Sequence, residues 1–170
     1  DMARLLPVCS LQVLDLTGCQ LEGAGAAGLT KALQTTLSLE ELQIAVSSLS
    51  PQAYQNLGEA LLVNKTLKRL ALLPNLDNRV PVDCLDVLPV LRALAYNSTL
   101  QRLMLVHVDH WNELLADTLG MVLKSPTTGL QELTLLGGTH HHQVDLRSFA
   151  WRRMIPALRE NKSLNLFSLS

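Results

Sequence analysis

Leucines recur along the chain in a fixed pattern, with polar residues between them. The stretch that begins at Leu11 reads LQVLDLTGCQL, with leucine at its first, fourth, sixth and eleventh positions. Alternation of apolar and other residues over its central part predicts a short β-strand with one apolar face. The same pattern begins again at five further leucines, which are Leu39, Leu67, Leu100, Leu130 and Leu164. These leucines lie 28, 28, 33, 30 and 34 residues apart, so the chain consists of six repeats of one unit.

A second pattern between the strands predicts a helix in each repeat. Leu57, Ala60 and Leu61, for example, fall on one face of a helix that precedes the strand at Leu67. Ser50 followed by Pro51 is typical of an N-cap and a first helical turn. Asparagine follows three of the helical stretches, at a position where it tolerates a left-handed backbone: Asn64, Asn97 and Asn161. Each repeat is therefore predicted to run strand, loop, helix, loop.

Repeats of this kind bury their apolar faces only by stacking on one another. The strands then form a parallel sheet, and the helices form a second layer. Because helices are about 10 Å wide and strands about 4.8 Å apart, the stack is expected to curve. We therefore predict an α/β solenoid over residues 1–170, a single domain of about six repeats with strands on the concave face and helices on the convex face. Neither end has the features of a capping repeat, so we expect a part of a larger protein.

The repeats resemble the leucine-rich-repeat family, whose motif L-x-x-L-x-L-x-x-N/C-x-L is matched from Leu11. Their length and the helix ends of the form AL-x-x-N-x-T/S-L are most similar to the ribonuclease-inhibitor type. That type also forms the C-terminal domains of nucleotide-binding leucine-rich-repeat receptors, so the resemblance implies non-enzymatic protein recognition, with ligand sensing or autoinhibition in a receptor. The chain departs from the motif by an insertion in NLDNRVPVDCLDVLP and at five single positions, which are Asp77, Val108, His110, Gly138 and His140.

Side-chain alternation predicts which residues face the concave side of the sheet. The first, fourth and sixth motif positions point inward, so the third, fifth and seventh point to the concave face. An apolar patch bordered by charge on that face is typical of a protein interface. The predicted protein-binding residues are Arg69, Ala71, Leu73, Arg102, Met104, Val106 and Leu136. Their partner is expected to be another protein or another part of the same chain, such as the insertion at 79–88.

Composition and charge exclude several other classes of function. With 14 basic and 15 acidic residues, and 4% aromatic residues, nothing favours nucleic acid or an anionic membrane. No apolar run approaches the roughly 18 residues of a membrane span, and no signal peptide opens the chain. Cys9, Cys19 and Cys84 are too few for a disulfide framework, so we expect buried thiols and a cytoplasmic location. Cys19 occupies the N/C position of the motif, where the side chain is expected to face the interior.

The stretch LEGAGAAGLTKAL contains Gly23, Gly25 and Gly28 in the spacing G-x-G-x-x-G of dinucleotide-binding loops. In such a loop the glycines follow a strand directly, whereas residues 17–22 intervene here. The next strand also lacks the acidic residue that would hold a ribose. We therefore expect no cofactor, and we interpret the small residues as close packing of a helix on its neighbour.

The histidines suggest an alternative function. All five lie between residues 107 and 142: His107, His110, His140, His141 and His142. His110 and His140 are equivalent in adjacent repeats, so their backbones are expected about 5 Å apart, and such imidazoles could hold zinc or copper. The alternatives are a metal-binding protein or metal-dependent enzyme using this cluster, and a cytoskeletal or ciliary scaffold, which fits the irregular repeat lengths. No catalytic triad or carboxylate pair stands out, so the main expectation is a non-enzymatic domain.

Overall fold

A computed structural model describes residues 2–6, 8–19, 21, 23–45, 49–73, 84–106, 113–136 and 149–169. Strands and helices alternate along these residues in the predicted order. The elements are α1 (Met2–Leu5), β1 (Val13–Leu16), α2 (Ala24–Thr35), β2 (Glu41–Ala45), α3 (Pro51–Val63), β3 (Arg69–Leu73), α4 (Cys84–Leu94), β4 (Arg102–Val106), α5 (Glu113–Lys124), β5 (Glu132–Leu136), α6 (Phe149–Glu160) and β6 (Leu166–Leu169).

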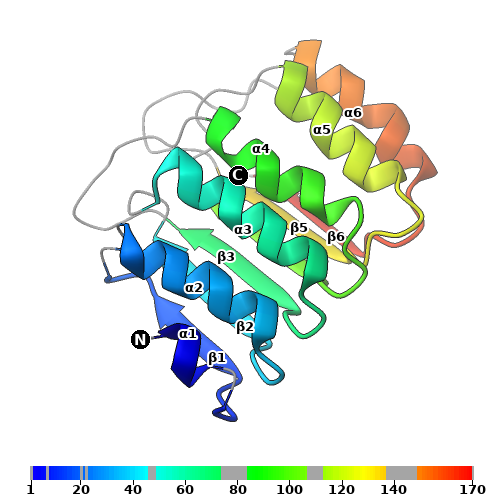
Figure 1. Ribbon diagram of the computed structural model, residues 1–170. Helices are drawn as coiled ribbons and strands as arrows, with labels where there is room; N and C mark the ends of the chain where they lie inside the picture. Colours follow the sequence, from blue (N-terminus) through cyan, green and yellow to red (C-terminus); the bar gives the residue numbers. More distant parts are fainter. Residues whose placement is uncertain are drawn as a thin grey trace.

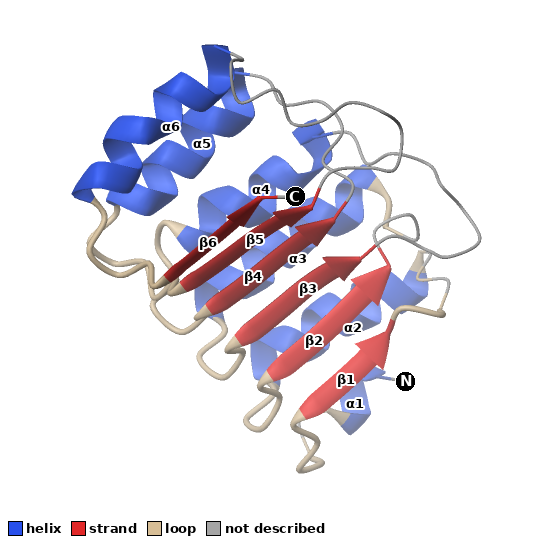
Figure 2. Cartoon of the chain, turned by 180° about the vertical axis from the view of Figure 1, so that it is seen from behind, coloured by secondary structure: helices blue, strands red, loops and turns tan. Residues whose placement is uncertain are grey.

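The six strands form one parallel sheet in the order β1 to β6, and their arrowheads point the same way in Figure 2. Each strand begins two residues after the leucine that opens its motif. The fourth motif positions of neighbouring strands lie opposite one another along a row of Leu14, Leu42, Leu70, Leu103, Leu133 and Phe167. The repeat register predicted from the leucines is therefore confirmed across the whole sheet.

All the described helices lie on one face of the sheet. In Figure 1 helices α2 to α6 lie side by side in front of the strands, and in Figure 2 the strands lie in front of the helices. The architecture is therefore α/β in two layers, and a parallel six-stranded sheet of this kind fits a leucine-rich repeat. Among the described residues, no helix lies on the opposite face of the sheet.

The core lies between the sheet and the helix layer. The leucines at the fourth and sixth motif positions of the inner strands are at most 2% exposed, as Leu42, Leu70, Leu103 and Leu135 illustrate. Leu57, Ala60 and Leu61 of α3 pack against them, as the helical spacing predicts. At the edge the burial is weaker, and Leu11 beside β1 is 40% exposed, because β1 has a paired strand on one side only within the described sheet.

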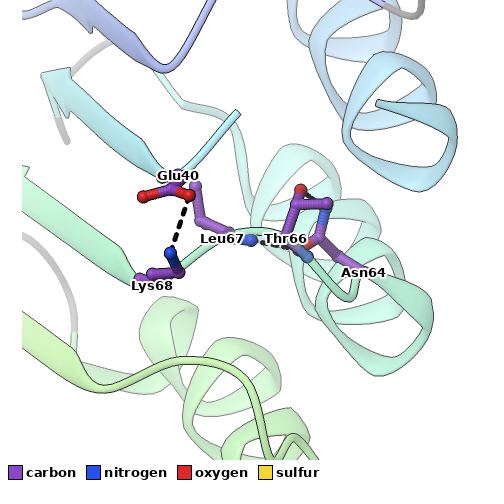
Figure 3. Close-up of polar contacts among 5 residues, drawn as sticks. All are labelled: Glu40, Asn64, Thr66, Leu67 and Lys68. Carbon is purple, nitrogen blue, oxygen red and sulfur yellow. Dashed lines mark hydrogen bonds and ion pairs between the residues drawn. The ribbon is translucent and has the colours of Figure 1, made fainter. Parts of the chain in front are cut away.

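Asparagine at the end of α3 links two successive repeats. The Nδ2 atom of Asn64 donates to the carbonyl oxygen of Leu33 at 2.6 Å, and its Oδ1 atom accepts from the backbone N–H of Thr66 at 3.0 Å and Leu67 at 2.8 Å. Figure 3 shows the contacts of Asn64 with Thr66 and Leu67 beside the ion pair of Lys68 with Glu40, which joins the same repeats at 2.6 Å.

The backbone conformation predicted for this asparagine is wrong. Asn64 has φ −66° and ψ 134°, which is extended rather than left-handed. The position selects asparagine for its side-chain hydrogen bonds, and Asn97 and Asn161 make the equivalent bonds to Leu61 and Leu123. Asn64 and Asn97 are at most 2% exposed, so their side chains serve these internal hydrogen bonds.

Local signals at the helix starts are confirmed in part. The Ser50 side chain accepts from the N–H of Ala53 at 3.2 Å, and Pro51 opens α3 as predicted. Gly23 precedes α2 with φ 49°, a conformation that favours glycine. A Cβ on Gly28 would meet nothing within 4 Å, and one on Gly25 would meet only a Leu21 methyl at 3.8 Å. The expectation that these two glycines serve close helix packing is therefore wrong.

The cysteine side chains also differ from the expectation. Cys9 and Cys19 are both exposed rather than buried. Cys19 follows β1, the edge strand, so within the described residues no neighbouring repeat lies on its outer side. The side chain of Cys84 lies outside the described part of the chain.

Candidate functional site

The side chains at the third, fifth and seventh motif positions form the face of the sheet that the helices leave uncovered, called the open face here. All seven predicted binding residues lie on it, because alternation places them opposite the buried leucines. Arg69, Arg102 and Met104 are exposed. The other four are half-buried, and these are Ala71, Leu73, Val106 and Leu136.

A depression of about 320 Å³ lies at the centre of the open face. Five of the seven predicted residues line it, all except Val106 and Leu136. Its position follows from side-chain size, because the single methyl group of Ala71 lies in register with the longer side chains of Gln43 and Met104 on the two neighbouring strands. The predicted residues are thus brought together around one hollow, with Val106 and Leu136 beyond its lining.

Two glutamates that the sequence reasoning missed belong to the same site. Arg69 Nη1 lies 3.0 Å from Glu41 Oε2, and Arg102 Nε lies 2.9 Å from Glu132 Oε2. Both glutamates occupy the third motif position, directly opposite the arginines in the strand register. The signal was present, because aligning the six repeats places Glu41, Arg69, Arg102 and Glu132 in one row.

One apolar residue at the seventh motif position adds nothing to the accessible surface of the open face. Ala45 of β2 occupies the seventh position but is fully buried. At the fifth and seventh motif positions, the accessible apolar side chains therefore begin at β3, where Ala71 and Leu73 line the depression. Met104, which is 37% exposed, is the most accessible apolar side chain beside it.

Asp15 on β1 places a further negative charge at the edge of the open face. Its Oδ1 atom accepts from the backbone N–H of Thr17 at 2.9 Å and from the Thr17 hydroxyl at 2.7 Å. The backbone hydrogen bond, and after it the hydroxyl, hold the pKa of Asp15 below its ordinary value. The side chain is therefore ionised at neutral pH.

A second depression, which the sequence did not predict, lies in the helix layer between α3 and α4. It has a volume of about 230 Å³ and is lined by residues that include Gly58, Leu62, Pro89 and Tyr96. Tyr96 is 67% exposed at its border. The sheet separates this second depression from the open face and its predicted binding residues.

The histidine alternative falls outside the described residues. None of the five histidines belongs to the described ranges, so the proposed metal cluster stays a prediction. Within the ranges given above, no three histidine, cysteine, aspartate or glutamate side chains gather as metal ligands. Of the helices described, none is long and apolar enough to cross a membrane.

Comparison with known proteins identifies the fold. No model of a protein family and no curated protein matches the chain. Among solved structures, the C-terminal domain of tropomodulin from Caenorhabditis elegans is similar with 17% identity and a TM-score of 0.65, over 85% of this chain and 82% of that one. The actin-binding site 2 of leiomodin-1 is similar with 17% identity and a TM-score of 0.62, over 91% and 84% of the two chains. At this identity the likeness shows a shared fold.

Proposed function

We propose that the chain is a single leucine-rich-repeat domain of the ribonuclease-inhibitor type, and that its function is non-enzymatic protein binding through the open face. Six units in register and the likeness to two solved structures support the solenoid. The observation that carries the function is the depression around Ala71, which has apolar walls at Leu73 and Met104 and charged pairs along one side. An apolar centre with a polar rim is the usual composition of a protein interface.

The size of the depression favours a protein over a small molecule. Ligand pockets usually have volumes of about 300–1,000 Å³ and enclose most of the ligand. A depression of about 320 Å³ is at the lower end of that range and lies on a sheet face rather than in a cavity. It has room for one or two side chains of a partner whose remaining contacts spread over the neighbouring strands.

A cytoskeletal partner is favoured over the ligand of a receptor. The similar solved structure of leiomodin-1 is an actin-binding site, and it matches 91% of this chain. Actin is therefore the first defined partner to test. The receptor role stays a prediction that no feature of the described fold favours.

Two double variants test the proposal, one altering the open face and the other altering the helix layer. Ala71→Trp/Met104→Glu fills the depression and places a charge at its border. Leu62→Glu/Tyr96→Glu is the control in the helix layer, where both side chains are at least 43% exposed. The wild type and both variants are sedimented with actin filaments, and in parallel are used to retain proteins from a cell lysate for mass spectrometry.

We expect the wild type and the helix-layer variant to retain the same protein, and the open-face variant to lose it. Circular dichroism checks that each variant folds, and the single variant Ala71→Trp replaces the double variant if Met104→Glu impairs folding. Equal retention by the open-face variant would overturn the proposal. Co-sedimentation with actin filaments decides separately whether actin is that partner.

A further inference from the structure

Four charged residues cross the open face in one row at the third motif position. Their order is Glu41, Arg69, Arg102 and Glu132, on β2 to β5. Arg69 and Arg102 lie directly opposite one another, and each pairs outward with the glutamate on its other side. The row therefore has two positive charges at its centre and one negative charge at each end.

The arginines are the more accessible members of the row. The side chains of Arg69 and Arg102 are 52% and 47% exposed, whereas those of Glu41 and Glu132 are 24% and 33% exposed. A partner that approaches the sheet therefore meets the guanidinium groups first. Each guanidinium has five N–H donors, so the contact with one glutamate oxygen leaves capacity for a second carboxylate. Exposed ion pairs contribute only about 0–1 kcal/mol, so the existing pairs do not prevent such a contact.

We propose that the partner inserts a carboxylate side chain between Arg69 and Arg102 and an apolar side chain into the depression at Ala71. This inference rests on the protein-binding function proposed above and specifies the chemistry of the partner. The depression adjoins the row, because Ala71 and Met104 lie two residues along their strands from the two arginines. That distance is about 7 Å, which is also the distance between residues i and i+2 of an extended segment. The recognised element is therefore an acidic residue two positions from an apolar one.

The ends of the row exclude a long polyanion as the preferred ligand. Nucleic acid carries a charge on every phosphate, so a strand crossing the sheet would bring phosphates near Glu41 or Glu132. Asp15 extends the negative charge farther toward β1. A single carboxylate between the arginines has a guanidinium group on each side and the glutamates one strand farther out, and it can accept two guanidinium hydrogen bonds at once.

The test uses short peptides and the whole chain. The probe is acetyl-Ser-Glu-Ser-Leu-Ser-amide, and the matched probes replace its glutamate by glutamine or its leucine by serine. Binding is measured from backbone amide shifts of isotope-labelled protein at peptide concentrations up to about 10 mM. Arg69→Gln/Arg102→Gln is compared with Arg153→Gln, which removes an ion-paired arginine from helix α6.

We expect the glutamate peptide to shift amides of β3 and β4, and the glutamine peptide to bind at least about tenfold more weakly. The serine peptide binds more weakly for lack of the apolar contact. Arg69→Gln/Arg102→Gln reduces binding of the glutamate peptide to the level of the glutamine peptide, while Arg153→Gln leaves it unchanged. Added salt weakens the binding of the glutamate peptide most.

Three results overturn this inference: no binding of the glutamate peptide, equal binding of the glutamate and glutamine peptides, or tighter binding of a thymidine oligonucleotide than of the glutamate peptide. The proposed function is judged separately with the retained protein partner. If that partner is lost by Ala71→Trp/Met104→Glu but retained by Arg69→Gln/Arg102→Gln, the open face binds protein and the carboxylate inference alone fails. If both variants retain it, the proposed function fails as well.

Discussion

Gly58 of α3 lies against the backbone of Pro89 in α4, so that a Cβ atom on Gly58 would be 2.6 Å from the Pro89 carbonyl oxygen. The carbonyl carbon would be 2.8 Å away. Both atoms belong to a helix backbone, which cannot move aside as a flexible side chain can. Glycine at this position therefore sets the spacing of two neighbouring repeats and forms part of the depression in the helix layer.

Replacing Gly58 tests this contact. Gly58→Ala is expected to lower the free energy of unfolding by about 1–2 kcal/mol, because overpacking outweighs the gain in helix propensity. Gly28→Ala is the control, since its Cβ would meet nothing within 4 Å, and it is expected to raise the free energy of unfolding by about 1 kcal/mol. Urea unfolding of both variants provides the measurement. Stabilisation by both substitutions would contradict the contact.

The hydrogen bonds of the Asn64 side chain predict that replacing this residue lowers the free energy of unfolding substantially. Asn64→Ala leaves one carbonyl oxygen and two N–H groups without their side-chain partner in a site that is 2% exposed. We expect a loss of about 3 kcal/mol in the free energy of unfolding. Asn161→Ala removes the equivalent bonds at a partly exposed site, where water replaces them, and is expected to cost less. Urea unfolding measures both variants, and an equal loss of unfolding free energy in the two would show that burial of the asparagine does not determine the loss.

Filling the depression separates binding from stability. Ala71→Trp places a large side chain in the space of about 320 Å³ on the open face. Because this space is on the surface, we expect the free energy of unfolding to change by less than about 0.5 kcal/mol. Retention of the protein partner is expected to fall strongly, as measured by the amount recovered from a lysate. A stable Ala71→Trp variant with normal retention would exclude the depression as a contact site.

The contact between Asp15 and Thr17 predicts a pH effect. The pKa of Asp15 is lowered in the folded chain from the usual 3.8, so its contribution to stability is present at neutral pH. That contribution is lost as the pH falls below about 3.8 and through the lowered pKa. Thr17→Val removes the hydroxyl bond and keeps the backbone N–H, so the pKa of Asp15 should rise partway toward its usual value. NMR titration of the Asp15 carboxyl group measures its pKa in each variant. Thr17→Ser is the control, because serine keeps the hydroxyl. An unchanged pKa in Thr17→Val would show that the hydroxyl does not contribute to the lowering.

The sheet and the open face could be predicted because both follow from local rules. The period of the leucines determines which side chains point to the helices, and alternation then places Arg69 and Met104 on the other side. The strand register followed from aligning the six motifs, since each strand pairs with the next repeat.

The features that the sequence reasoning missed depend on contacts between repeats. Asn64 combines an extended backbone with a bond to Leu33 in the preceding repeat, and a pattern within one repeat does not show that bond. The pairing of Arg69 with Glu41 required the third motif positions to be compared across strands. Gly58 was unremarkable in sequence because its need for glycine comes from the distance between two helices.

The central claim is that a protein partner docks on the open face, and site-specific photocrosslinking tests it most directly. A photoreactive phenylalanine analogue replaces Met104 at the depression or, in a second protein, Tyr96 in the helix layer. Both side chains are exposed, at 37% and 67% respectively, so either can react with a protein that lies on its own layer. The account predicts that the retained partner crosslinks at position 104 and not at position 96. Crosslinking at position 96 alone would contradict it and place the partner on the helices.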